Sequence, residues 1–280
     1  MGVRRLPGVA ALLTAGAIAL PGCGTQAPQR STASSPVISP GATAVSPVVA
    51  RIASGAQSGP AAATVTAPRK TLKLGSKGEA VRWLQTRLAQ LGYRPGKADG
   101  RYGGSTLTAV WAFQKVNGIK PSSTVAKRTW DALETPKAPK ILVRNGKPTR
   151  AEVNLTKQIM VLYVGGQVKL ITHISSGSGV PYCEIATWQG KRQRFCGSAG
   201  TPTGDYKTTW RARGWHRSYL GQLYNPIFFN GGIAFHGALS VPLYPASHGC
   251  VRMPMNVAEV LPGMLGKGVP VHVRGKFRRA

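Results

Sequence analysis

The sequence predicts a multidomain protein in which a small three-helix bundle precedes a β-dominated domain. Apolar residues recur at helical spacing between residues 72 and 133. From residue 158 onward the pattern changes to short runs rich in β-branched and aromatic residues, bounded by glycine. A proline- and lysine-rich stretch, residues 135–149, lies between the two patterns and is typical of a linker.

An apolar run near the N-terminus predicts export. Arg4 and Arg5 precede residues 9–20, which contain no charged side chain, and this order is typical of a secretion signal. The run is shorter than the roughly 20 apolar residues that a membrane-spanning helix needs. We therefore expect residues 1–22 to be a signal peptide, either cleaved or kept as an anchor.

The end of this run, Leu20-Pro21-Gly22-Cys23, resembles the lipobox of bacterial lipoproteins. That resemblance implies a lipoprotein-type signal and lipidation of Cys23 as the first mature residue. Pro21 departs from the box, so ordinary cleavage with release is the alternative. Residues 24–70 contain no acidic and no aromatic residue, and we expect residues 23–70 to form a disordered tether.

Three helices are expected in the next sixty residues. Ser76-Lys77-Gly78-Glu79 has the form of a capping box and predicts the start of the first helix, which Gly92 ends. A second helix is expected from about Ser105, and Trp130 with Leu133 indicates a third. The apolar residues that define the first two helices are Val81, Leu84, Leu88, Leu91, Leu107, Val110 and Phe113.

This segment, residues 71–134, resembles the three-helix peptidoglycan-binding domain of bacteria. We expect Trp111, Phe113 and Trp130 to be core residues, and the glycan contacts to lie on the loops between helices. The resemblance is carried by Gly75, Gly78, Val81, Leu84-Gln85, Leu91-Gly92-Tyr93, Asp99-Gly100, Thr106, Ala109-Val110, Phe113-Gln114 and Trp130.

The second domain begins with a hairpin signal. Residues 158–164 and 167–173 are β-rich runs separated by Gly165-Gly166. A short helix is expected between Met255 and Leu265, interrupted by Pro262. Further strands are expected at residues 206–211, 226–229, 232–236 and 269–273.

Two motifs in this domain carry the chemistry, Phe235-His236-Gly237 and Ser247-His248-Gly249-Cys250-Val251-Arg252. A cysteine thiol with a pKa near 8.5 is only slightly ionised at neutral pH, so a nucleophilic cysteine needs an imidazole within reach and donors for an oxyanion. His236 ends a predicted strand, Cys250 follows fourteen residues later, and Gly249 allows close backbone approach.

These motifs resemble the L,D-transpeptidase, or YkuD-like, catalytic domain, and supporting pieces place it at residues 150–275, before a basic tail at 276–280. The resemblance implies that Cys250 is the nucleophile, His236 the general base and the Gly237 carbonyl an acceptor that orients the imidazole. His248 and the N–H groups of Gly249 and Cys250 would shape the oxyanion site.

Ser247 and Arg252 would contact the substrate under the same resemblance. For His248 a structural brace is the alternative role, and for Arg252 an ion pair with the nearby Glu259.

The implied reaction is cell-wall cross-linking. Cys250 would attack the carbonyl between the third residue and the terminal D-alanine of a tetrapeptide stem, D-alanine would leave, and the amine of a second stem would take the acyl group. No cofactor and no metal is expected. With water as acceptor the same site would be an L,D-carboxypeptidase, and a non-catalytic peptidoglycan-binding wall protein is the other alternative.

Cys183 and Cys196 flank a polar segment inserted where the resembled family usually runs directly onward. In an exported protein such a pair indicates a disulfide. It is also the pair that remains if Cys23 is lipidated and Cys250 stays a free thiol. A zinc site is the alternative, although the close spacing of typical zinc ligands is missing.

The formal net charge of +29, from 37 Lys and Arg against 8 Asp and Glu, implies a polyanionic neighbour. The basic residues are scattered and no zinc-finger, helix-turn-helix or RNA-binding signature is present, so nucleic acid is not the expected partner. We expect peptidoglycan stems and glycan, anionic wall polymers and, through the lipid anchor, the membrane as partners. The expected location is the outer face of the cytoplasmic membrane or the cell wall.

Overall fold

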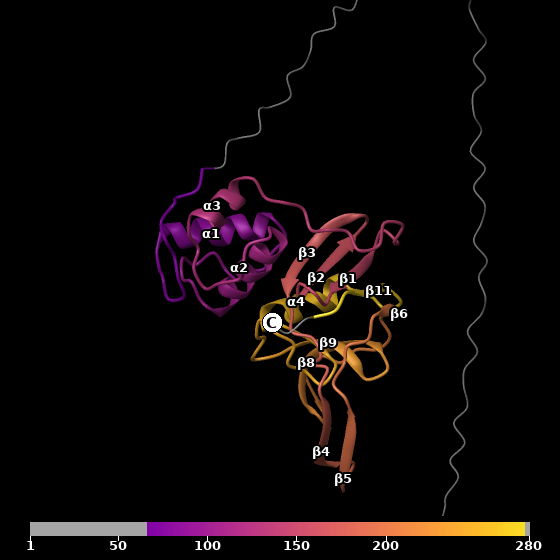
Figure 1. The fold of residues 1–280 in the computed structure, drawn as a ribbon. Coiled ribbons are helices and arrows are strands. Elements are labelled where there is room, and N and C mark those ends of the chain that lie inside the picture. Colours follow the sequence, from indigo (N-terminus) through magenta and orange to yellow (C-terminus); the bar gives the residue numbers. More distant parts are fainter. Residues whose placement is uncertain (1–65, 278–280) are drawn as a thin grey trace, which may run out of the picture. The chain divides into compact units, whose positions relative to one another are not determined.

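The computed structural model describes residues 66–277 of the chain (Figure 1). The predicted signal peptide, Cys23, nearly all of the predicted tether and the last three residues lie outside the described residues. Among the residues described, no helix is long and apolar enough to cross a membrane.

The helical domain contains three helices, α1 (Glu79–Gln90), α2 (Gly104–Val116) and α3 (Lys127–Glu134), as the sequence predicts. Phe113 and Trp130 are fully buried in its core. Trp111 is not part of that core, because it is only partly buried and its ring lies 5.3 Å from the ring of His173 in the β-rich domain.

The predicted capping box is wrong. The residue before α1 is Gly78, no side chain caps the helix, and Ser76 Oγ instead accepts a hydrogen bond from the N–H of Lys73 at 3.0 Å. Gly78 has φ 110°, a conformation that favours glycine, so the turn into α1 is set by this glycine.

Order in the helical domain begins earlier than expected. Residues 67–70, which the sequence assigns to the tether, pack against α3. Ala67 is buried and its N–H donates to Glu134 at 2.8 Å, and the indole N–H of Trp130 donates to the Lys70 carbonyl at 2.9 Å. These partners lie 67 and 60 residues away along the chain, beyond the reach of a local sequence pattern.

The β-rich domain contains two larger sheets and a separate two-stranded sheet (Figure 1). One five-stranded sheet has the order β3-β2-β1-β11-β6, with β1 (Arg150–Asn154), β2 (Ile159–Val164), β3 (Gln167–His173), β6 (Gly204–Lys207) and β11 (Pro270–Arg274). The four-stranded sheet has the order β10-β9-β8-β7, with β7 (Trp215–Ser218), β8 (Gly221–Asn230), β9 (Ile233–Gly237) and β10 (Val251–Met253). A shared apolar core connects both sheets, with Met160 and Val271 from the first and Phe235 and Val251 from the second.

The predicted Gly165-Gly166 hairpin is present between β2 and β3. The expected strand at 206–211 is shorter, because β6 ends at Lys207. The polar segment between Cys183 and Cys196 forms strands β4 (Pro181–Trp188) and β5 (Lys191–Ser198), which the sequence does not predict. Most of their side chains are exposed, so no alternation of apolar and polar residues marks them as strands.

The last helix, α4 (Met255–Met264), continues through Pro262, so the expected interruption is wrong. A proline inside a helix leaves the carbonyl four residues earlier without its usual donor. Here that carbonyl belongs to Ala258, and the side-chain amide of Asn225 donates to it at 3.2 Å. A long-range hydrogen bond therefore replaces the one that proline removes.

The helical domain and the β-rich domain share a buried contact. Tyr93 and Ile171 belong to one apolar cluster. Lys115 Nζ lies 2.8 Å from His173 Nδ1, and His173 Nε2 lies 3.0 Å from the Val241 carbonyl. Burial and the nearby Lys115 charge lower the pKa of His173 to about 3, so the imidazole is neutral and its Nε2–H donates to that carbonyl.

Candidate active site

The cysteine and histidine motifs come together on neighbouring strands. β9 and β10 are parallel, and Val251 pairs with Phe235 while Arg252 pairs with His236. Side chains two residues apart on a strand share a face, so Cys250, just before β10, lies on the face that carries His236. The Cys250 side chain packs against Ala234, which is also on that face.

His236 is buried and held in one orientation. Its Nδ1 lies 2.9 Å from the Gly237 carbonyl, and because a carbonyl can only accept, Nδ1 carries the proton. Nε2 is then the basic nitrogen. Burial, with a smaller contribution from the Arg252 charge, lowers the pKa of His236 to about 4, although the Gly237 hydrogen bond opposes this shift. The imidazole is therefore neutral at neutral pH.

Cys250 is partly buried, and its Sγ lies 3.6 Å from the Gly232 carbonyl oxygen. Burial raises the pKa of its thiol, while a hydrogen bond from the Ala234 backbone and the Arg252 charge act in the opposite direction. The resting pair is consequently a neutral thiol and a neutral imidazole. A base that accepts the thiol proton during attack suits this arrangement.

The loop before Cys250 is braced by Ser247. Its hydroxyl donates to the Cys250 carbonyl at 2.5 Å and accepts the Gly249 N–H at 3.0 Å. The Ser247 side chain is buried, so the hydroxyl contacts the loop backbone rather than an open groove. Because the Gly249 N–H is used in this bond, Cys250 N–H is the remaining donor of the pair that the sequence assigns to the oxyanion.

Position 249 requires a glycine, because of its backbone conformation and the chain packed beside it. Its φ is 136°, and a Cβ there would lie 3.0 Å from the Gly200 carbonyl oxygen. A side chain at this position would strain the backbone and press on the neighbouring chain. The glycine thus allows the loop before Cys250 to lie against residues 200 and 201.

Thr201 is a site residue that sequence reasoning did not single out. Its hydroxyl donates to the Gly249 carbonyl at 2.6 Å and accepts the Gly177 N–H at 2.8 Å. It therefore connects two segments to the peptide bond that precedes Cys250. The available signal was the segment Gly200-Thr201-Pro202-Thr203-Gly204, which resembles the family without indicating a role for the threonine.

The backbone of Arg252 is held in place, because its N–H and carbonyl groups exchange two hydrogen bonds with the backbone of Ser175, at 2.9 and 3.0 Å. Its side chain forms no ion pair with Glu259 or with any other residue that the structure describes. Its charge acts on the pKa values of both His236 and Cys250. A cationic group that pairs with none of residues 66–277 therefore acts on Cys250 and His236.

His248 is in contact with the β4–β5 hairpin. Its Nε2 lies 2.7 Å from Glu184 Oε1, and its ring meets the Tyr182 ring edge-on at 4.7 Å. A disulfide joins Cys183 and Cys196 across the hairpin. The inserted segment thus directly contacts the loop that leads into Cys250.

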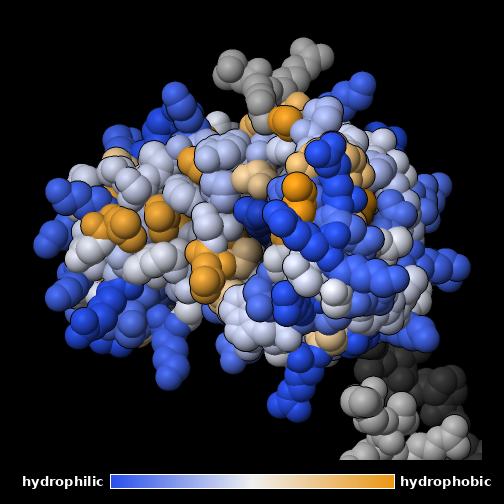
Figure 2. All heavy atoms as spheres, turned by 90° about the horizontal axis from the view of Figure 1, so that it is seen from below, coloured by the Kyte–Doolittle hydropathy of each residue, from blue (hydrophilic) through white to orange (hydrophobic). Residues whose placement is uncertain are grey.

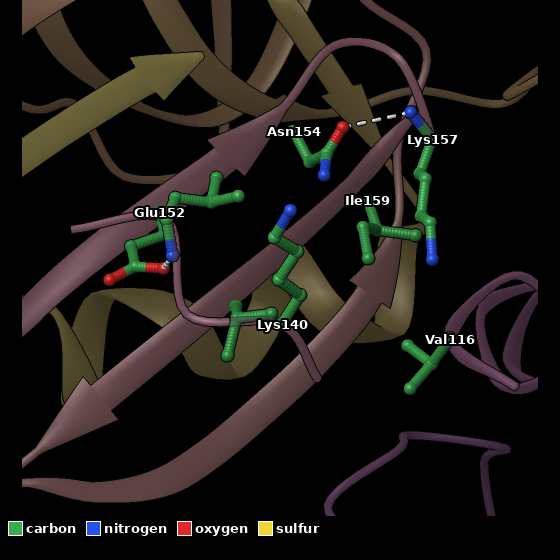
Figure 3. Close-up of a pocket in the computed structure, with 8 residues that line it drawn as sticks. Val116, Lys140, Glu152, Asn154, Lys157 and Ile159 are labelled. Atoms are coloured by element: carbon green, nitrogen blue, oxygen red, sulfur yellow. Dashed lines mark hydrogen bonds between the residues drawn. The ribbon is translucent and has the colours of Figure 1, made fainter. Parts of the chain in front are cut away.

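Two hollows lie elsewhere. A cavity of about 10 Å³, which holds about one water molecule, is lined by residues that include Lys140, Glu152 and Lys157 (Figure 3). A larger hollow of about 400 Å³ is lined by residues 92–97, Lys169 and part of α4. Neither hollow is lined by Cys250 or His236, so neither coincides with the β9–β10 face that carries these two residues.

Known proteins match both domains of the chain. The sequence model of the L,D-transpeptidase catalytic domain (YkuD) matches residues 148–273, and a peptidoglycan binding domain model matches residues 77–133. A solved L,D-transpeptidase from Xylanimonas cellulosilytica is 37% identical with a TM-score of 0.64, over 73% of this chain and 98% of that one. The chain belongs to the L,D-transpeptidase family.

Two other proteins are similar to this L,D-transpeptidase, one at lower sequence identity and the other over a shorter segment. The solved L,D-transpeptidase of Stackebrandtia nassauensis is 26% identical with a TM-score of 0.40, over 77% of this chain and 98% of that one. A curated Kitasatospora aureofaciens protein, described as "Uncharacterized protein in bpoA1 3'region", is 39% identical over 64 residues, 22% of this chain. The match covers 54%, about half, of that curated relative.

In the described part of this L,D-transpeptidase, no group of three or more His, Cys, Asp or Glu side chains is placed to hold a metal ion. The two cysteines for which the sequence left zinc as an alternative are joined to each other instead. Cys250 is the one free cysteine among residues 66–277.

Proposed function

We propose that the chain cross-links peptidoglycan by transferring a stem-peptide acyl group from a thioester on Cys250 to the amine of a second stem. The observation that carries this proposal is the shared face of β9 and β10, where a neutral, oriented His236 accompanies a partly buried thiol. Family membership supplies the substrate class.

In the first half of the reaction, His236 Nε2 accepts the thiol proton while Cys250 Sγ attacks the carbonyl between the third residue and the terminal D-alanine. The oxyanion that forms is stabilised by backbone N–H groups, with that of Cys250 as the donor we favour. His236 then gives its proton to the departing amine, so free D-alanine leaves and a thioester remains.

Arg252, Ser247 and His248 have different roles in the remaining steps. The Arg252 guanidinium, which forms no ion pair within the part of the chain that the structure describes, suits the terminal carboxylate of the donor stem. Ser247, for which a substrate contact was expected, is better explained as a positioning residue, because both hydrogen bonds of its hydroxyl go to the loop that carries Cys250. His248 faces Glu184 and belongs to the second half of the reaction.

The test is intact-protein mass spectrometry after incubation with a disaccharide-tetrapeptide. The parent enzyme should gain the acyl group and release one D-alanine, and Cys250→Ala should do neither while it keeps its fold and its binding to wall sacculi. Acylation of the Cys250→Ala variant would contradict the proposal. Hydrolysed tripeptide as the sole product would identify an L,D-carboxypeptidase, and no adduct on the parent would favour a non-catalytic wall protein.

We further propose that the protein works outside the cytoplasm, held to the outer face of the membrane by a lipid on Cys23. The apolar run and the lipobox-like residues 20–23 support export and lipidation. Incorporation of a labelled fatty acid by the parent, and its loss in Cys23→Ser, would be the expected result. Label-free parent protein in the medium would indicate ordinary cleavage and release.

The charge of +29 supports anionic wall polymers as a second partner. Figure 2 shows hydrophilic side chains spread over the visible face, with hydrophobic ones in small separate groups. Such a surface is suited to diffuse electrostatic attraction more than to one apolar docking patch. The peptidoglycan-binding domain would add a contact that depends on shape.

A further inference from the structure

The β4–β5 hairpin is a separate two-stranded sheet that extends away from the two larger sheets (Figure 1). Cys183 and Cys196 are opposite each other in its register and are joined by the disulfide. Phe195 stacks on Tyr219, from the turn between β7 and β8, at 4.2 Å between ring centres. The disulfide therefore joins the two strands of the hairpin to each other, and the aromatic stack packs the hairpin against the turn between β7 and β8.

Tyr182 and Glu184, on either side of Cys183, face the catalytic loop. Glu184 Oε1 lies 2.7 Å from His248 Nε2, and because a carboxylate can only accept, His248 Nε2 carries the proton. The Tyr182 phenol is hydrogen-bonded to Tyr219 and interacts electrostatically with both Glu184 and Cys250. Through its contact with His248, the Glu184 carboxylate thus lies beside the loop that leads into Cys250.

This carboxylate is unusual in its surroundings. The chain has 8 acidic residues against 37 basic ones, yet Glu184 pairs with no Lys or Arg in the part of the chain that the structure describes. Its side chain is 46% exposed, and its second oxygen has no hydrogen-bond partner among those residues. An anionic group therefore remains accessible beside the loop, while Arg252 supplies a cationic group on the β10 side.

The two opposite charges match the two substrates of a transpeptidation. The donor stem ends in a carboxylate, which suits Arg252, whereas the acceptor arrives with a protonated amine. We propose that Glu184 binds the ammonium group of the acceptor stem and thereby favours an amine over water as acceptor of the acyl group. This inference rests on the proposed function, because it concerns the second half of the same reaction.

Transfer of the acyl group from the thioester to the acceptor amine needs no further reactant. The acceptor ammonium loses one proton and its nitrogen attacks the thioester carbonyl carbon. A C–N bond forms, the C–S bond breaks, and the amine gives up a second proton. One of the two protons returns to Cys250 as the thiol hydrogen, by way of His236, and the other passes to solvent. Glu184 contributes by concentrating and orienting the ammonium before it is deprotonated.

The experiment measures how the acyl-enzyme divides between an amine and water. The full mature protein is acylated with disaccharide-tetrapeptide in the presence of Nα-acetyl-lysine, and the ratio of amide product to hydrolysed tripeptide is determined. Glu184→Gln keeps an oxygen that can accept from His248 but removes the charge. We expect the ratio to fall roughly fivefold, about 1 kcal/mol, while the rate of D-alanine release changes less than the ratio.

Three controls test whether the change in the product ratio comes from the charge of Glu184. Glu259→Gln removes an exposed carboxylate of the same domain and should leave the ratio at the parent value. Glu184→Asp keeps the charge and should recover part of the ratio. Hydroxylamine, an amine that is uncharged at neutral pH, should be used equally well by the parent and by Glu184→Gln, because it has no ammonium group to bind.

The outcomes separate this inference from the function on which it rests. If the parent forms no acyl-enzyme, the proposed function itself has failed. If the parent cross-links but Glu184→Gln has an unchanged ratio, or loses hydroxylamine and lysine acceptors equally, the ammonium site is refuted. A defect confined to D-alanine release would place Glu184 at the donor stem and would also overturn the proposal.

Discussion

Thr201→Val tests whether the loop before Cys250 is held by hydrogen bonds from a distant segment. Valine has nearly the shape of threonine but cannot donate to the Gly249 carbonyl or accept the Gly177 N–H, two contacts of 2.6 and 2.8 Å in the parent. The threonine is buried, so water cannot easily replace the lost hydroxyl. The substitution therefore leaves two backbone groups unsatisfied with little change in packing.

The expected loss of stability follows from these two groups. A buried polar group without a partner costs about 1–3 kcal/mol, so with two such groups the free energy of unfolding should fall by about 2–6 kcal/mol. The Gly249 carbonyl belongs to the peptide bond that leads into Cys250, so its movement shifts the nucleophile. A displacement near 1 Å can lower the rate of a positioned reaction about a hundredfold.

Urea denaturation and the rate of acyl-enzyme formation measure the two effects. Thr201→Ser is the matched control, because it keeps the hydroxyl and removes one methyl group, which contributes about 0.8 kcal/mol when buried. If Thr201→Val equals the parent in both assays, the hydroxyl does not hold the loop. If Thr201→Ser is as damaged as Thr201→Val, packing of the methyl group explains the effect instead.

Three further predictions concern the base, the disulfide and wall binding. Acylation should persist below pH 6.5 and fall as the pH drops through about 4, because the lowered pKa of His236 keeps the imidazole neutral until then; half-loss near 6.5 would contradict this. Non-reducing peptide mapping should find Cys183 joined to Cys196, with Cys250 alkylated by iodoacetamide without reduction, and a free Cys183 would be the opposing result. Binding of the mature protein to wall sacculi should weaken steeply with salt, because exposed charges more than about 10 Å apart are screened at 0.1 M, and should then reach a salt-resistant level. Complete release at moderate salt would show that electrostatics alone holds the enzyme to the wall.

The helices and the central hairpin were predictable because their signals are local. Val81, Leu84 and Leu88 fall on one face of α1 through the helical repeat, and Gly165-Gly166 directly joins two β-rich runs. The cap of α1 was not predictable from the same kind of pattern. Ser76 has the right residue type and spacing, but Gly78 alone adopts the backbone conformation that the turn requires.

The sequence by itself indicated the enzyme family and the order in the chain of the two residues that we propose to react. His236 and Cys250 stand in motifs that resemble the L,D-transpeptidase family, and the family match and the solved relative confirm the family. Their common face follows from the register of β9 and β10, which is a property of the folded sheet.

Only the tertiary structure decided which groups surround this pair. Thr201 lies 48 residues from Gly249, and Glu184 lies 64 residues from His248, so no local periodicity connects either pair. The β4–β5 strands are exposed on most positions and carry no pattern of burial that a sequence could show. Hydrogen bonds between distant segments depend on how whole strands are placed, and the burial that shifts the pKa values of His236 and Cys250 exists only once those strands have packed.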